Sequence, residues 1–167
     1  MRRGSRILID TNAIIEAHRV GCWRALCGYF TMESVEECVA ECGTGDQMRE
    51  DRVQVDVELL RKQMAVHPVS VELVIEFMKK VPDDFYDLDK GEKELLAYAF
   101  SRSEEVYILC SPDKASMRIG KLVGLLDSFK SLEEIAIKAG RANLRLPDPF
   151  NEHWHLRYRS NLLLEDI

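Results

Sequence analysis

The sequence predicts an α/β fold in which a central parallel sheet lies between two layers of helices. Two short apolar runs, at residues 6–10 and 106–110, are typical of strands that are buried on both faces. Segments with helical spacing and helix-capping residues separate the strand candidates, and this alternation is typical of a parallel sheet with helices on both faces. We therefore expect a three-layer α/β/α sandwich formed by residues 1–140, followed by a C-terminal extension at residues 141–167.

The first half of the chain begins with the strand at residues 6–10, and Thr11 or Asn12 can cap the amphipathic helix that follows. Thr31 or Ser34 can cap a second helix, which the Gly43-Thr44-Gly45 sequence ends. The polar residues 46–62 show only weak helical spacing. The expected elements are a strand at 6–10, a helix at 11–27, a short strand at 28–31 and a helix at 35–42.

In the second half, Ser70 is a helix cap, and Val81-Pro82-Asp83-Asp84 interrupts the helix after Lys80. Pro112 is expected at the first position of a later helix, Ser131 caps the last core helix, and Gly140 ends it. The expected elements are strands at 64–69, 106–110 and 122–126, and helices at 70–80, 91–101, 111–120 and 131–139.

Composition limits the class of protein. The 167 residues are 46% hydrophobic, enough for the core of one domain. No run approaches the roughly 18 apolar residues that span a bilayer, and no signal-peptide pattern follows Met1, so we expect a cytoplasmic protein without a membrane partner. Five cysteines without CxxC spacing indicate reduced, mostly buried thiols. Cys38 and Cys42 lie one helical turn apart, but no histidine stands nearby at zinc-ligand spacing.

The net charge of −6 argues against a protein that holds nucleic acid on a large basic face. It leaves open an enzyme that acts on nucleic acid through a bound metal ion. The scattered basic residues either contact an RNA backbone or belong to ordinary solvated helix faces. They are Lys90, Lys93, Lys114, Arg118 and Lys121.

The extension mixes aromatic and cationic residues, as single-strand binders do: His153-Trp154-His155, Arg157, Tyr158 and Arg159. The other interpretation is a tail that packs on the core or completes a dimer interface, and we favour it. His18 and His67 have no matching partner and are expected to be structural.

Acidic residues follow the expected strands. Asp10 ends the first strand, and Asp113 comes three residues after the strand at 106–110. Because parallel strands present their carboxyl ends at one edge of the sheet, these aspartates can meet there. Glu37 and Glu92 lie on helices near the same edge. The simpler alternative is that each acid only stabilises a helix N-terminus.

Four segments carry a resemblance, in this order: Ile7-Leu8-Ile9-Asp10-Thr11-Asn12, Thr31-x-x-Ser34-Val35-x-Glu37, Leu88-Asp89-x-Gly91-Glu92-x-x-Leu95-Leu96-Ala97-x-Ala99 and Leu109-x-Ser111-x-Asp113-Lys114-Ala115. Together they cover about residues 5–138 and resemble the PIN domain, a family of metal-dependent nucleases that includes the VapC-type toxins. The resemblance implies that Asp10, Glu37, Glu92 and Asp113 hold the metal, and that Asn12 (or Thr11) steadies them.

Two positions depart from the family pattern. Glu92 stands where many members have an aspartate, and Pro112 stands where a second acid is common. Glu94 competes with Glu92, although two residues apart on a helix face about 200° apart, so only one can face the site. Asp127 is a further candidate carboxylate.

The resemblance implies an endoribonuclease with Mg²⁺ or Mn²⁺ bound by carboxylates, the ligands that these ions prefer. It also implies the toxin of a toxin–antitoxin pair, with RNA as substrate, a cognate antitoxin and a homodimer. The alternative is a PIN-like binding or scaffold protein with weak or no catalysis. A flavodoxin-like nucleotide-binding domain is disfavoured because no glycine-rich phosphate loop follows the first strand.

Overall fold

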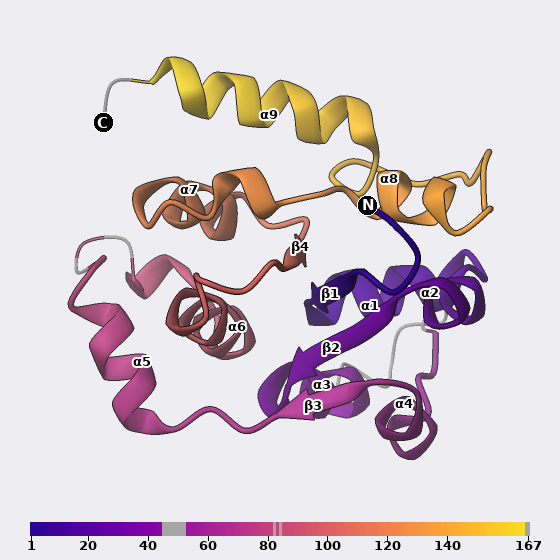
Figure 1. The fold of residues 1–167 in the computed structure, drawn as a ribbon, viewed down its shortest axis with the longest axis horizontal. Helices are drawn as coiled ribbons and strands as arrows, with labels where there is room; N and C mark the ends of the chain where they lie inside the picture. The colour runs from indigo at the N-terminus through magenta and orange to yellow at the C-terminus, as the bar shows by residue number, and fades with distance from the viewer. Residues whose placement is uncertain (45–52, 82, 84, 166–167) are drawn as a thin grey trace.

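A parallel four-stranded sheet forms the centre of the fold. The computed structural model describes residues 1–44, 53–81, 83 and 85–165 (Figure 1). Within them the strand order is β3-β2-β1-β4, and Leu8 of β1 pairs in register with Glu33 of β2 and Leu109 of β4. The strands are β1 (Arg6–Ile9), β2 (Thr31–Val35), β3 (Ala65–His67) and β4 (Ile108–Cys110).

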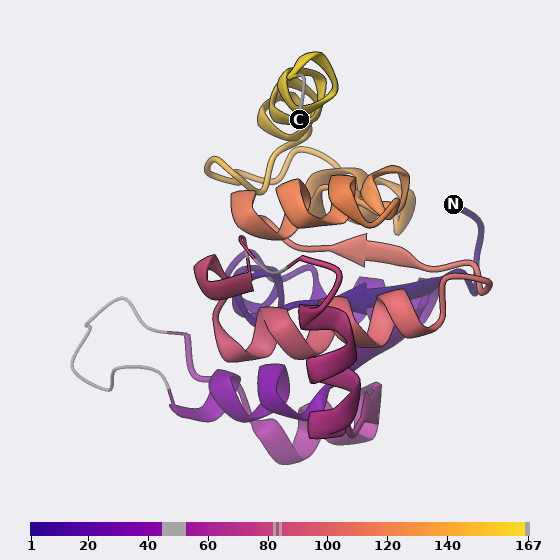
Figure 2. The ribbon, with the colours of Figure 1, turned by 90° about the vertical axis from the view of Figure 1, so that its left-hand side faces the viewer.

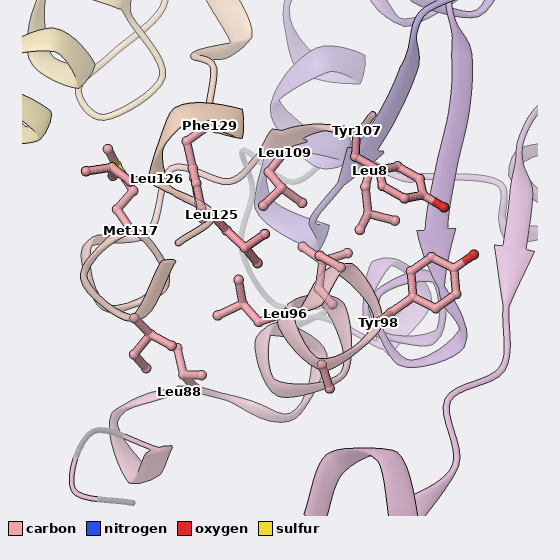
Figure 3. Close-up of a cluster of buried hydrophobic side chains, with 14 of the residues drawn as sticks. Leu8, Leu88, Leu96, Tyr98, Tyr107, Leu109, Met117, Leu125, Leu126 and Phe129 are labelled. Atoms are coloured by element: carbon pink, nitrogen blue, oxygen red, sulfur yellow. The ribbon is translucent and has the colours of Figure 1, made fainter. Parts of the chain in front are cut away.

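Helices cover both faces of this sheet, which confirms the predicted α/β class. Leu8 and Leu109 face the core formed with α5 (Val71–Met78), α6 (Lys90–Ser101) and α7 (Lys114–Leu122). Figure 3 shows this core, with Leu96 of α6 below the sheet residues and Met117 of α7 beside them. The opposite face packs on α1 (Thr11–Arg19), α2 (Trp23–Tyr29) and α8 (Leu132–Lys138), while α3 (Glu36–Thr44) and α4 (Val57–Gln63) flank β2 and β3.

The predicted single helix at 11–27 is wrong. Gly21 has φ +69°, a left-handed conformation that ends a helix, and it separates α1 from α2. Gly28 lies inside α2, so the expected strand at 28–31 begins only at Thr31 and extends to Val35. The helix expected at 35–42 therefore begins one residue later, at Glu36.

The predicted strand at 122–126 is also wrong. The helix α7 continues to Leu122, Gly124 takes φ +77°, and a short 3₁₀ helix, η2, occupies Leu126–Ser128. The sheet is extended only by a parallel bridge between Phe129 and Leu109. Pro112 does not start a helix, because Asp113 is the N-cap of α7 and Lys114 its first residue.

The remaining expected elements lie close to their predicted positions. The helix α4 overlaps the weakly patterned stretch 46–62 and ends one residue beyond it. Residues 45–52, Pro82 and Asp84 lie outside the described residues. A second 3₁₀ helix, η1, occupies Phe85–Asp87. The extension forms α9 (Glu152–Leu164), which packs against α7 and α8 at the edge of the molecule (Figure 2). Among the described helices, none is long and apolar enough to cross a membrane.

Candidate functional site

Three helices begin with an aspartate N-cap at the carboxyl edge of the sheet: Asp10 for α1, Asp89 for α6 and Asp113 for α7. In each aspartate, Oδ1 accepts a hydrogen bond from a backbone N–H of the first turn, at 2.8–2.9 Å. Capping stabilises these helices and accounts for one oxygen of each carboxylate. The second oxygen, Oδ2, is left for another partner.

Asp10 is the most deeply buried of these acids, with 2% of its surface exposed. It directly follows β1, and the hydroxyl of Ser111, which follows β4, donates to its Oδ2 at 2.6 Å. Burial raises the pKa of Asp10 to about 6, although the Ser111 hydrogen bond acts to lower it. The adjacency of β1 and β4 in the sheet thus places a polar pair at the strand ends.

Glu92 lies in the first turn of α6 and is 7% exposed. Its Oε2 accepts from the backbone N–H of Asp89 at 3.0 Å, which completes a capping box. Burial raises the pKa of Glu92 to about 8, and the negative charges of Asp113, Asp89 and Asp10 add to the shift. The four carboxylates are therefore within electrostatic reach of one another.

The helix α3 contributes Glu41 to this group, whereas the sequence predicts Glu37. Glu37 forms an ion pair with Lys90, at 2.5 Å, and is partly exposed. Glu41, one turn later, accepts from the hydroxyl of Thr11 at 2.6 Å and from the backbone N–H of Gly91 at 3.2 Å. A side chain at Gly91 would place its Cβ 2.7 Å from Glu41 Oε2, so only glycine lets Glu41 approach α6 this closely. Glu41 follows Glu37 by four residues, so both lie on the same face of α3, and this helical spacing is the sequence signal that points to Glu41.

We call Asp10, Glu41, Asp89, Glu92 and Asp113 the acidic cluster. The other predicted candidates lie outside it. The side chain of Asn12 is exposed, and only its backbone N–H acts on Asp10, to lower its pKa. Glu94 lies with Val69, Val71 and Val74 around a cavity of about 150 Å³. Asp127 forms an ion pair with Arg159 of α9.

The cysteines are free thiols, and all but Cys27 are buried. Burial raises the pKa of both Cys38 and Cys42, and the nearby Asp10 and Glu41 carboxylates raise it further. Thiols that stay protonated are poor metal ligands.

The acidic cluster has no built-in cation: in the described part of the chain, none of its five carboxylates forms an ion pair. Among the residues that the structure describes, no group of three or more His, Cys, Asp or Glu side chains is arranged to hold a metal ion. The chemistry of the cluster nevertheless fits a hard divalent cation, because every donor is oxygen and the charge is uncompensated. One turn from Asp113, the buried Ser116 hydroxyl also lacks a hydrogen-bond partner among the described residues.

Comparison with known proteins adds no assignment. No protein family model matches the chain, and no curated protein matches it. The PIN-domain likeness is therefore a resemblance carried by the four sequence motifs.

Proposed function

We propose that this protein is a Mg²⁺- or Mn²⁺-dependent endoribonuclease that hydrolyses RNA phosphodiester bonds at the acidic cluster. One observation carries the proposal. Asp10 and Glu92 are buried carboxylates whose pKa values are raised to about 6 and about 8, and neither has a cation partner among the described side chains. Uncompensated buried acids are unfavourable unless a cation joins them. Their place at the carboxyl edge of a parallel sheet is where ligands bind in such folds.

The residues of the cluster divide into two roles in this proposal. Asp10 and Asp113 would hold the ion with carboxylates that also cap α1 and α7. With the ion bound and Glu92 ionised, its Oε1, which the capping contact leaves open, would accept a proton from a water, and Glu41 would complete the anionic wall. When bound, the ion would neutralise charge on the scissile phosphate and make a water more acidic.

The resemblance to PIN domains supplies the biological part of the proposal. It supports RNA as the substrate, a role as the toxin of a toxin–antitoxin pair with a cognate antitoxin, and a homodimer in the cytoplasm. The resemblance assigns Glu37 to the metal. Because Glu37 forms an ion pair with Lys90, this proposal places it outside the set of residues that would hold the ion.

The deciding experiment compares RNA cleavage by the wild-type protein with Asp10→Asn and Asp113→Asn, in Mn²⁺ and in excess EDTA. Asparagine preserves N-capping, so both variants should fold while cleavage falls at least about 100-fold. Asp56→Asn is the matched control, because Asp56 caps α4 through Leu59 N–H in the same way but lies outside the cluster. Expression of the wild type, but not of Asp113→Asn, should arrest bacterial growth.

Cleavage that survives both substitutions and the chelator would refute the proposal. A wild-type protein that neither cleaves RNA nor binds Mn²⁺ in a calorimetric titration would favour the binding or scaffold alternative, in which the aspartates serve only as helix caps.

A further inference from the structure

The C-terminal helix α9 lies over α7 (Figures 1 and 2) and packs against it. The N-cap of α7 is Asp113 of the acidic cluster. At the start of α7, the Tyr158 hydroxyl donates to the backbone carbonyl of Lys114 at 3.3 Å. At its other end, Lys121 Nζ donates to the carbonyls of Leu162 and Glu165, which caps the last turn of α9. The extension therefore has a fixed position relative to Asp113.

Two aromatic rings of α9 lie beside the side chain of Lys114, the first residue of α7. Trp154 and Tyr158 stack with their ring centroids 5.3 Å apart and their planes 16° apart. The ammonium group of Lys114 lies 6.0 Å from the Trp154 centroid and 5.6 Å from the Tyr158 centroid. Ring faces attract cations at such distances, so α9 restricts where the ammonium of Lys114 can lie.

The position of Lys114 is electrostatically unfavourable within its own helix, α7. A cation at a helix N-terminus faces the positive end of the helix dipole. Lys90 occupies the equivalent first position of α6 and is neutralised by Glu37. Lys114 is exposed, and in the described part of the chain no carboxylate forms an ion pair with it. Its charge is therefore available to an anion from solution, next to Asp113.

We propose that Lys114 binds a backbone phosphate of single-stranded RNA beside the scissile position, and that Trp154 and Tyr158 of α9 position its ammonium group. The inference rests on the proposed ribonuclease function and assigns part of its substrate site to the extension. An exposed lysine held on aromatic rings is suited to this task, because lysine contacts phosphate as a point charge and little rotamer freedom remains to be lost on binding. It also supplies a local cation that the net charge of −6 would not lead one to expect.

The test measures binding of a short 5′-labelled single-stranded RNA in EDTA over a series of salt concentrations, together with steady-state cleavage in Mn²⁺. Lys114→Gln should raise Kd and KM about 5- to 10-fold, leave kcat within about twofold, and reduce the slope of log Kd against log salt by about 0.7–1. Lys114→Arg should retain most of the binding. Lys138→Gln is the matched control, since Lys138 is an exposed helical lysine on α8 without an ion-pair partner among the described residues.

The role of α9 is tested by separating the ring of Tyr158 from its hydroxyl. Tyr158→Leu removes the ring under Lys114 and should raise Kd about two- to threefold, while Tyr158→Phe keeps the ring and should bind as the wild type does. A merely structural role of Tyr158 would alter thermal stability without changing the Kd of the folded protein.

The outcomes separate this inference from the proposed function. If RNA is cleaved but Lys114→Gln shows the Kd and salt slope of the wild type, the inference is wrong and the ribonuclease stands. If the wild type binds RNA without cleaving it, and Lys114→Gln weakens that binding, the inference stands and the ribonuclease proposal fails. A wild type that binds no RNA overturns both.

Discussion

Two buried carboxylates beside strand β1, Glu33 and Asp10, have opposite electrostatic environments. Glu33 of β2 is 3% exposed and accepts from Nε of Arg6, the first residue of β1, at 2.5 Å, with His67 Nε2 2.8 Å away. Burial acts to raise the pKa of Glu33, but the hydrogen bonds from Arg6 and His67 outweigh it, and the pKa lies below its ordinary value. At the carboxyl end, Asp10 is equally buried, yet its pKa is raised.

The difference shows which of the two acids has its counter-charge within the fold. Arg6 joins Glu33 to Glu105 and to the hydroxyl of Tyr107, so this ionic network is closed by side chains of the chain itself. The acidic cluster around Asp10 offers carboxylate oxygens and no cation among the described residues. A closed network loses stability when one of its members is removed, whereas an open one gains stability from a cation that arrives from solution.

The largest predicted contrast is in stability. Glu33→Gln leaves the charge of Arg6 without its buried counter-charge and should lower the free energy of unfolding by about 2–4 kcal/mol. Asp10→Asn removes an uncompensated charge and keeps the helix cap, so the metal-free protein should be unchanged or slightly more stable. Urea denaturation in EDTA at pH 7.5 measures both, and equal losses in the two variants would contradict the comparison.

A second contrast is in the pH dependence of the metal-free protein. Folded Glu92, with its pKa raised to about 8, keeps a proton that the unfolded chain has released above about pH 4.5. The free energy of unfolding should therefore fall as pH rises toward 8, by about 1–3 kcal/mol in total, because ionising Glu92 in the fold is unfavourable. Glu92→Gln should flatten this dependence while preserving the capping box.

Two choices isolate Glu92 in that experiment. Between pH 7 and 8, Asp10 is already largely ionised, and the buried His155, whose pKa burial lowers to about 4, is neutral in the fold. The five thiols, whose pKa values burial raises, contribute equally to the wild type and to Glu92→Gln. Glu76→Gln is the control, since Glu76 is an exposed carboxylate on α5 paired with Lys79. Saturating Mn²⁺ should remove the decline in the wild type. A wild-type profile as steep as that of Glu92→Gln would show that Glu92 does not carry a raised pKa.

The sequence predicts the layers of this fold because its central strands are apolar runs. The strands β1 and β4 lie where those runs predict them. The sequence pattern places the second strand at 28–31 instead of Thr31–Val35, because Glu33 at the centre of β2 interrupts the apolar pattern. That carboxylate is acceptable in a buried strand only through Arg6, 27 positions away, and no local pattern contains such a partner.

The same distinction holds for the candidate site. Strand ends follow from topology, so Asp10 and Asp113 could be placed at the carboxyl edge from the sequence. The choice between Glu37 and Glu41 depends on which turn of α3 lies beside Gly91 of α6, and that position along the helix axis is set by packing, including the close approach at Gly91. The aromatic pair under Lys114 required the path of the extension, which no periodicity in residues 141–167 reveals.

The smallest predicted effect sharpens the comparison within α3. Glu41 has no ion-pair partner among the described residues and contacts Thr11 and Gly91, whereas Glu37 is neutralised by Lys90. Glu41→Gln should therefore lower Mn²⁺-dependent cleavage about 10-fold and weaken Mn²⁺ binding in calorimetry, while Glu37→Gln should change each by less than about threefold. Both variants exchange one glutamate of the same helix for its isostere, so each serves as the control for the other. The reverse order of effects would return Glu37 to the metal and make the Lys90 ion pair a contact that the bound cation must displace.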